Sequence, residues 1–146
     1  MVLNSEFKNN RHSIYNLKYR LVVVTKYRHK CINTDILNDL KEIFNRIITS
    51  NNGSILEFNG ESDHVHLLFE TPPQVELAKL INNLKTVSSR LIRKKYGEYL
   101  KQYYWENVFW SRSYCILTTG GATIEMIEKY IPVSYTHLTL PTNSLV

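Results

Sequence analysis

The fold is decided by the stretch Glu61-Ser62-Asp63-His64-Val65-His66-Leu67-Leu68-Phe69, which carries two histidines on a short apolar run. If the run is a strand, residues two positions apart point to the same side of the sheet. His64 and His66 then project together, while Val65 and Leu67 face the opposite side. Two imidazoles held side by side are half of a metal site. The pattern makes a metal site a candidate, although by spacing alone two half-buried structural histidines are the commoner explanation.

The segments before and around this stretch predict alternating strands and helices. β-branched and aromatic residues indicate a strand over Leu17–Thr25. Apolar residues at three- and four-residue steps indicate a helix over Thr34–Ser50, with Thr34 as its N-cap. A second strand is expected over 54–58, and a tight turn at Asn59-Gly60 should join it to the histidine strand.

The second half of the chain continues the same alternation. We expect a helix over 75–96, a tyrosine-rich loop over 97–106, a strand over 108–118 and a third helix opening at Thr123. The order is that of the ferredoxin-like split βαβ plan, an α+β fold whose antiparallel sheet carries two helices on one face. Its first and third strands are central neighbours, which places the histidines in the middle of the sheet. The C-terminal helix, which carries Tyr130, is an addition to this plan.

Composition narrows the class of protein. The chain has 146 residues, a formal charge of +5 and 43% hydrophobic residues, as expected for one soluble domain that tolerates a polyanionic partner. No apolar run approaches the roughly 18–20 residues of a membrane span, so we expect no membrane contact. Cys31 and Cys115 have neither the spacing of a metal site nor that of a disulfide framework, which fits a cytoplasmic protein.

Five segments match a known group of enzymes in the same order. They read KYRHK, DHVHLLF, LKTVSSRLIRKKY, FWSRSYCILTTGG and TIEMIEKYI. Together they resemble the small single-tyrosine transposases of bacterial insertion sequences, the transposase A type of the HUH nuclease superfamily. The resemblance covers roughly residues 14–131 and joins a His-hydrophobe-His strand to a tyrosine helix that follows a glycine break. By position alone, Tyr130 would be a packing residue.

The resemblance implies a DNA transposase that cleaves and rejoins single-stranded element ends through a 5′-phosphotyrosine intermediate. His64 and His66 would hold Mg²⁺ or Mn²⁺ on the scissile phosphate, and Tyr130 would be the catalytic nucleophile. The partners would be single-stranded DNA hairpin ends and a second subunit, since in the group the tyrosine helix of one subunit can serve the histidine pair of the other. The alternative is a catalytically impaired protein that binds single-stranded DNA or hairpins.

Basic and aromatic side chains would hold the DNA under this interpretation, although a solvated helix face and an aromatic core would leave similar patterns. The basic residues expected to contact phosphates are Lys26, Arg28, Lys30, Lys85, Arg90, Arg93 and Arg112. The aromatic residues expected to stack on unpaired bases are Tyr27, Tyr103, Tyr104, Trp105 and Trp110.

The end of the chain departs from the pattern of this group. Its members carry a polar residue, commonly glutamine, four positions after the tyrosine as the third metal ligand. Here that position is Ser134, and Pro132 should end the helix before it. Residues 132–146 contain no charged side chain, so we interpret them as a disordered or foreign tail after a transposase-like domain over 1–131. A small-molecule metal hydrolase is disfavoured, because Asp63 is expected on the wrong face of the strand.

Overall fold

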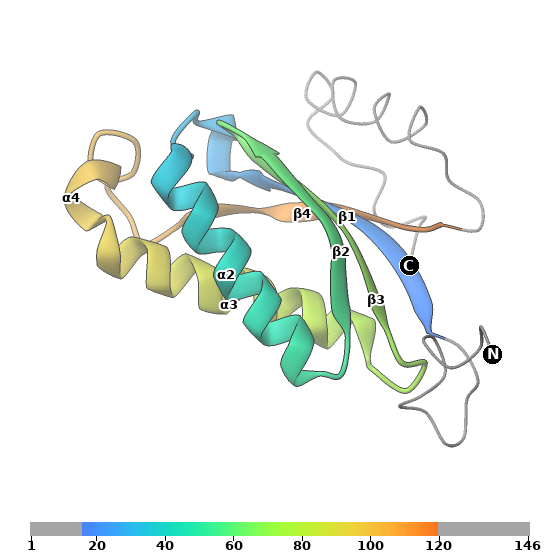
Figure 1. Cartoon of the computed structure of the whole chain (residues 1–146). Helices are drawn as coiled ribbons and strands as arrows, with labels where there is room; N and C mark the ends of the chain where they lie inside the picture. Colours follow the sequence, from blue (N-terminus) through green and yellow to red (C-terminus); the bar gives the residue numbers. More distant parts are fainter. Residues whose placement is uncertain (1–15, 120–146) are drawn as a thin grey trace.

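A four-stranded antiparallel sheet with two long helices makes up most of the computed structural model, which describes residues 16–119 (Figure 1). In chain order the elements are β1 (Leu17–Thr25), the 3-10 turn η1 (Lys26–Arg28), α2 (Thr34–Ser50), β2 (Ser54–Glu61), β3 (His64–Thr71), α3 (Leu77–Lys95), the short helix α4 (Gly97–Leu100) and β4 (Trp110–Thr118). The expected tyrosine helix and the tail over 132–146 lie outside the described residues.

The strand order confirms the predicted α+β plan. The strands lie in the order β2-β3-β1-β4, and each pairs antiparallel with its neighbours. β3 and β1 are therefore the central pair, as the ferredoxin-like order requires. His66 pairs with Val22 of β1 on one side and with Asn59 of β2 on the other. The histidine strand is thus fixed from both sides.

Both long helices cover the same face of the sheet (Figure 1). In α2, Leu40, Phe44 and Ile48 recur every four residues and are completely buried. They pack in one core with apolar residues of α3 and with the alternate strand residues Leu21, Val23, Val65, Leu67 and Phe69. Burying a side chain of this size stabilises the fold by roughly 1.5–3 kcal/mol. This burial fixes which face of each strand turns away from the helices.

The face turned away from the helices is apolar beside the histidines. His64 pairs with Val24, and His66 pairs with Val22, so all four side chains point to this face. Both valines are buried without belonging to the core under the helices. Cys115, which pairs with Val22 from β4, is buried on the same face. The histidine pair consequently lies against apolar surface.

The predicted turn of the hairpin was misplaced. Asn59 and Gly60 lie inside β2, and Ser62 and Asp63 make the turn between β2 and β3. Gly60 gives space to α2 and does not form a turn, because a Cβ atom there would lie 2.5 Å from Cδ1 of Leu37 in α2. Glycine inside a strand often marks such a close approach.

Other boundaries differ slightly from expectation. The N-cap of α2 is Asn33 and not Thr34, since the Asn33 side chain accepts a hydrogen bond of 2.8 Å from the backbone N–H of Ile36. α3 begins two residues later than predicted, β4 begins at Trp110, and the tyrosine-rich loop contains α4. Within residues 16–119, no helix has the length and apolar character needed to cross a membrane.

Candidate active site

β3 presents the two histidines on the face turned away from the helices. Val65 and Leu67, the residues that alternate with them, are completely buried in the core. Rotating the strand to hide the histidines would expose both apolar side chains, so the core itself sets their direction. His64 is 7% exposed, and His66 is half-buried. The two imidazoles share one face, as their spacing predicted.

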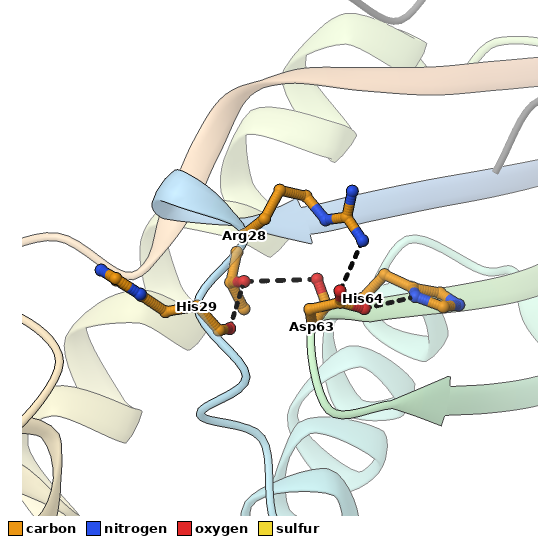
Figure 2. A network of polar contacts seen from close by, with 5 residues as sticks. Arg28, His29, Asp63 and His64 are labelled. Atoms are coloured by element: carbon orange, nitrogen blue, oxygen red, sulfur yellow. Dashed lines mark hydrogen bonds and ion pairs between the residues drawn. The ribbon is translucent and has the colours of Figure 1, made fainter. Parts of the chain in front are cut away.

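Asp63 holds His64 from the hairpin turn. Its Oδ1 lies 2.9 Å from Nδ1 of His64, and its Oδ2 accepts a hydrogen bond of 2.5 Å from Nη2 of Arg28. Figure 2 shows the carboxylate lying between the two partners. The expectation that Asp63 falls on the wrong face was wrong, because Asp63 belongs to the turn, where the alternation of strand side chains does not apply.

The charge on Asp63 decides how His64 is protonated. Burial alone would raise the pKa of this carboxyl, but hydrogen bonds from His64 and Arg28, and the positive charge of Arg28, outweigh it and hold the pKa below its usual value. An ionised carboxylate only accepts hydrogen bonds, so the proton lies on Nδ1 of His64. In the neutral imidazole with this tautomer, the lone pair lies on Nε2, which is then the nitrogen that can bind a metal ion.

The turn that carries Arg28 has an unusual backbone. Tyr27 and Arg28 both have a φ of 58°, which lies in the left-handed region that residues other than glycine and asparagine seldom adopt. Each such residue costs of order 1 kcal/mol or more. In this conformation Arg28 reaches Asp63, whereas Tyr27 is 65% exposed.

Two hydroxyl groups hold this turn in place. Thr25, at the end of β1, donates a hydrogen bond of 2.7 Å to the carbonyl oxygen of His29, and its backbone N–H donates one of 3.0 Å to that of Asp63. Tyr104 donates a hydrogen bond of 2.7 Å to the carbonyl oxygen of Lys26. Nothing in a linear reading of the sequence singled out Thr25 for this role.

The two imidazoles could supply two donors to a divalent cation, because they lie on one face of β3. Within residues 16–119, no cluster of three His, Cys, Asp or Glu side chains could hold a metal ion. Two imidazole nitrogens would therefore leave several positions for water and for phosphate oxygens, as in catalytic sites. Tyr130, and Ser134 at the expected third-ligand position, lie outside the described residues.

The seven basic residues expected to bind DNA fall into two groups. Lys26, Arg28 and Lys30 lie in and just after η1, at the end of β1. Lys85, Arg90 and Arg93 are on α3, and Arg112 is on β4. The structure brings Lys85 and Arg112 together: Nζ of Lys85 donates a hydrogen bond of 2.8 Å to the Arg112 carbonyl oxygen.

Burial changes what several of the expected DNA contacts can do. It lowers the pKa of Lys85 to about 8, so this side chain loses its charge at a lower pH than a surface lysine does. Trp110 is buried and donates a hydrogen bond of 2.8 Å to Oγ of Ser88, and Tyr104 is buried as well. Both rings serve the core, so the expectation that they stack on bases was wrong for them. Tyr27 and Trp105 are exposed.

Comparison with known proteins gives one consistent result. The sequence model of the family described as "Transposase IS200 like" matches residues 13–133. The ISDra2 transposase TnpA of Deinococcus radiodurans is 34% identical over 90% of this chain and 93% of its own length. The transposase for insertion sequence element IS200 of Salmonella typhimurium is 32% identical over 85% of this chain and 80% of its own length.

Solved structures agree with the sequence comparisons. A crystal structure of a candidate transposase from Deinococcus radiodurans superposes with a TM-score of 0.74 at 33% identity, covering 85% of this chain and 95% of that one. A tyrosine transposase associated with REP sequences, solved with a REP hairpin, superposes with a TM-score of 0.56 at 11% identity, over 83% of this chain and 68% of that one, and supports the fold alone. On the extent of these matches, the chain belongs to the IS200-like transposase family.

Proposed function

We propose that this transposase cleaves and rejoins single-stranded DNA ends with Tyr130 as the nucleophile and with a divalent cation at His64 and His66. The observation that carries the proposal is the common orientation of the two imidazoles, one of them held at Nδ1 by Asp63 at 2.9 Å. An orienting carboxylate behind a histidine is typical of metal ligands. Family membership supplies the reaction class, because transposases break and re-form DNA strands.

The protein's own residues would perform the reaction in two steps. The phenolate oxygen of Tyr130 attacks phosphorus, the bond to the 3′ oxygen breaks, and that oxygen takes up a proton to become a free 3′-hydroxyl. The 5′-phosphotyrosine conserves the bond energy, so the 3′-hydroxyl of a second end can attack it and release the tyrosine. Mg²⁺ or Mn²⁺ on the histidines would withdraw charge from the phosphate. Lys26, Arg28 and Lys30, beside the site, would neutralise neighbouring phosphates.

Labelled single-stranded element ends incubated with Mn²⁺ test this proposal on a denaturing gel. We expect a protein–DNA adduct that disappears with Tyr130→Phe and with chelator, and that falls at least 100-fold in rate with His64→Ala or His66→Ala. The control is Lys41→Ala, an exposed change on α2, which should leave the adduct intact. An adduct that survives Tyr130→Phe would contradict the assignment of the nucleophile.

Shared active sites would make this enzyme a homodimer. If the tyrosine of one subunit acts at the histidines of the other, mixing Tyr130→Phe with the double variant His64→Ala/His66→Ala should restore up to about a quarter of the activity. Half of the randomly formed dimers are heterodimers, and one of the two sites in each heterodimer is complete. No recovery after co-refolding would place all three residues in one subunit.

A catalytically impaired DNA-binding protein is the second candidate, and the end of the sequence favours it. Pro132 and Ser134 stand where the resemblance implies a continuing helix and a polar metal ligand, commonly glutamine. Under this candidate the protein binds hairpin ends in a salt-sensitive manner, but it binds Mn²⁺ weakly and forms no adduct. Restoring glutamine with Ser134→Gln would then not suffice, since a proline at position 132 is expected to end the helix before that residue.

A further inference from the structure

An exposed tryptophan stands at a hollow between the end of α3, α4 and the segment that follows. Trp105 is 98% exposed, the highest value among the large apolar side chains of residues 16–119. The hollow has a volume of about 680 Å³, and Tyr99, Tyr104 and Trp105 are among its lining residues. A fully hydrated indole beside the half-buried ring of Tyr99 offers a flat apolar surface to a planar ligand.

The hollow carries an excess of positive charge. Its rim holds four cations and two acids, which are Arg93, Lys94, Lys95, Lys101, Glu98 and Glu106. Lys95 pairs with Asp39 at 2.9 Å, and Lys101 pairs with Glu98 at 2.8 Å. Arg93 and Lys94 form no ion pair within residues 16–119. A planar and anionic ligand would therefore find both a stacking surface and two available cations.

Aromatic rings connect this hollow to the candidate active site. The ring of Tyr27 lies 5.8 Å from that of His29, His29 lies 6.0 Å from Tyr103, and Tyr103 lies 5.6 Å from Tyr99 at the hollow. We call these four residues the aromatic ridge. At its other end Tyr27 directly precedes Arg28, which contacts Asp63 and through it His64. Figure 1 shows η1 and the β2–β3 turn at the end of the sheet nearest α4.

Tyr27, the first residue of the aromatic ridge, has a strained backbone and an exposed ring. Tyr27 keeps a left-handed φ of 58° while its side chain is 65% exposed. Burial of the tyrosine therefore does not offset this strain. Backbone strain that the surrounding hydrogen bonds maintain is concentrated at functional sites. Figure 2 shows the neighbouring His29 ring directed away from His64, on the other side of the turn.

We propose that the aromatic ridge and the hollow beside Trp105 form a subsite for unpaired nucleotides of the DNA strand whose scissile phosphate lies at the histidine pair. Trp105 stacks on one base of the strand, and Arg93 and Lys94 neutralise the phosphates next to that base. Because every base has an aromatic face, such a subsite accepts any sequence and rejects a paired duplex. The inference rests on the proposed function, since it concerns the same strand.

Tryptophan fluorescence tests the subsite directly. The chain has two tryptophans, and Trp110 is buried, so the solvent-exposed emission comes from Trp105. The probe is a thymidine 12-mer, compared with an abasic strand of equal length, in the Tyr130→Phe protein without metal. We expect the thymidine strand to quench Trp105 and to bind about 5- to 150-fold more tightly than the abasic strand. Trp105→Ala should remove this preference, and Trp105→Phe should keep part of it.

Matched variants distinguish the contribution of base stacking to affinity from that of charge and from an unspecific effect of mutation. Leu56→Ala removes another exposed apolar side chain on β2 and should change neither affinity. Lys94→Ala should weaken both strands and reduce the slope of log affinity against log salt by about 0.7, whereas Lys41→Ala on α2 should not. Equal affinity of the Tyr130→Phe protein for both strands, or an unchanged preference after Trp105→Ala is added to it, would overturn the subsite.

The adduct assay keeps this inference distinct from the proposed function. Normal adduct formation together with no base preference would contradict the subsite alone. A Trp105-dependent base preference without any adduct would support the subsite and contradict the nuclease reaction.

Discussion

At the scale of single residues, the site depends on a carboxylate that strand periodicity could not place. The sequence gives the shared direction of His64 and His66, because that follows from the two-residue repeat and from the burial of Val65 and Leu67. The position of Asp63 depends on where the hairpin turns. A turn at Asn59-Gly60 would put Asp63 in the following strand, with its side chain on the face opposite to His64. The contact between Asp63 and His64 could therefore not be predicted from the sequence.

Removing this carboxylate should weaken the metal binding that we propose for His64 and His66. Without Asp63, His64 loses the partner that fixes its tautomer and ring orientation, and such losses cost about 10- to 100-fold in metal affinity. We expect Asp63→Ala to raise the Kd for Mn²⁺, measured by calorimetry without DNA, by this factor. Asp63→Asn should have a smaller effect, because the amide oxygen can still accept from Nδ1.

The control for this experiment is Glu61→Gln, which removes an exposed acid from the end of β2. Its effect on Mn²⁺ affinity should stay below about threefold, since exposed charges interact weakly through water. Equal Kd values for Asp63→Ala and the native protein, with both folded by circular dichroism, would show that Asp63 does not orient a ligand.

At the scale of elements, periodicity predicted the strands and long helices well and the connections poorly. The bounds of β1 and α2 follow from apolar patterns that extend over two or more turns or pleats. The turn was predicted at Asn59-Gly60 because glycine is common in turns, but glycine also occurs where two elements approach closely. Only the packing of α2 on β2 distinguishes these two roles at Gly60. The strained turn η1 has no glycine or asparagine at its left-handed positions, so no local rule predicts it.

Gly53, which directly precedes β2, and Gly60, which lies inside β2, should respond differently to alanine. A Cβ at Gly53 would lie 2.4 Å from the backbone oxygen of Glu70, which cannot move without disturbing the pairing of β2 with β3. A Cβ at Gly60 would meet Cδ1 of Leu37, the flexible end of a side chain. By urea unfolding we expect Gly53→Ala to cost about 2–3 kcal/mol and Gly60→Ala about 1 kcal/mol or less.

The close contact itself can be tested with a double variant. Leu37→Ala removes the methyl group that Gly60→Ala would strike, so the alanine at Gly60 should cost less in that background. A coupling of about 0.5 kcal/mol or more between the two sites is expected for residues in contact. Additive costs would mean that the clash is relieved elsewhere.

At the scale of the whole molecule, the burial of Lys85 affects both the stability of the fold and the positive charge available to bind DNA. The chain carries a formal charge of +5, and a surface that binds DNA needs cations near its phosphates. One of these cations is half-buried between α3 and β4, where it lies 5.4 Å over the ring of Tyr114. Burial stabilises the apolar stem of a lysine but disfavours its charged end. The position therefore serves the packing of α3 on β4 at the expense of charge.

This arrangement predicts that stability depends on pH in a definite direction. Burial lowers the pKa of Lys85 to about 8, whereas in the unfolded chain it has the ordinary value of 10.5. Between these values the unfolded state binds more protons, so the contribution of Lys85 to the free energy of unfolding rises with pH. Measured by urea unfolding, the native protein should gain stability relative to Lys85→Met from pH 7 to pH 9.5.

The matched control is Lys94→Met, which removes an equal charge from an exposed position on the same helix. If overall repulsion in a positively charged protein caused the effect, both variants would change the pH dependence alike. If desolvation at one buried site causes it, only Lys85→Met removes the rise. Parallel pH profiles for the native protein and Lys85→Met would mean that the ammonium group remains hydrated, and that Lys85 keeps its full charge for a phosphate.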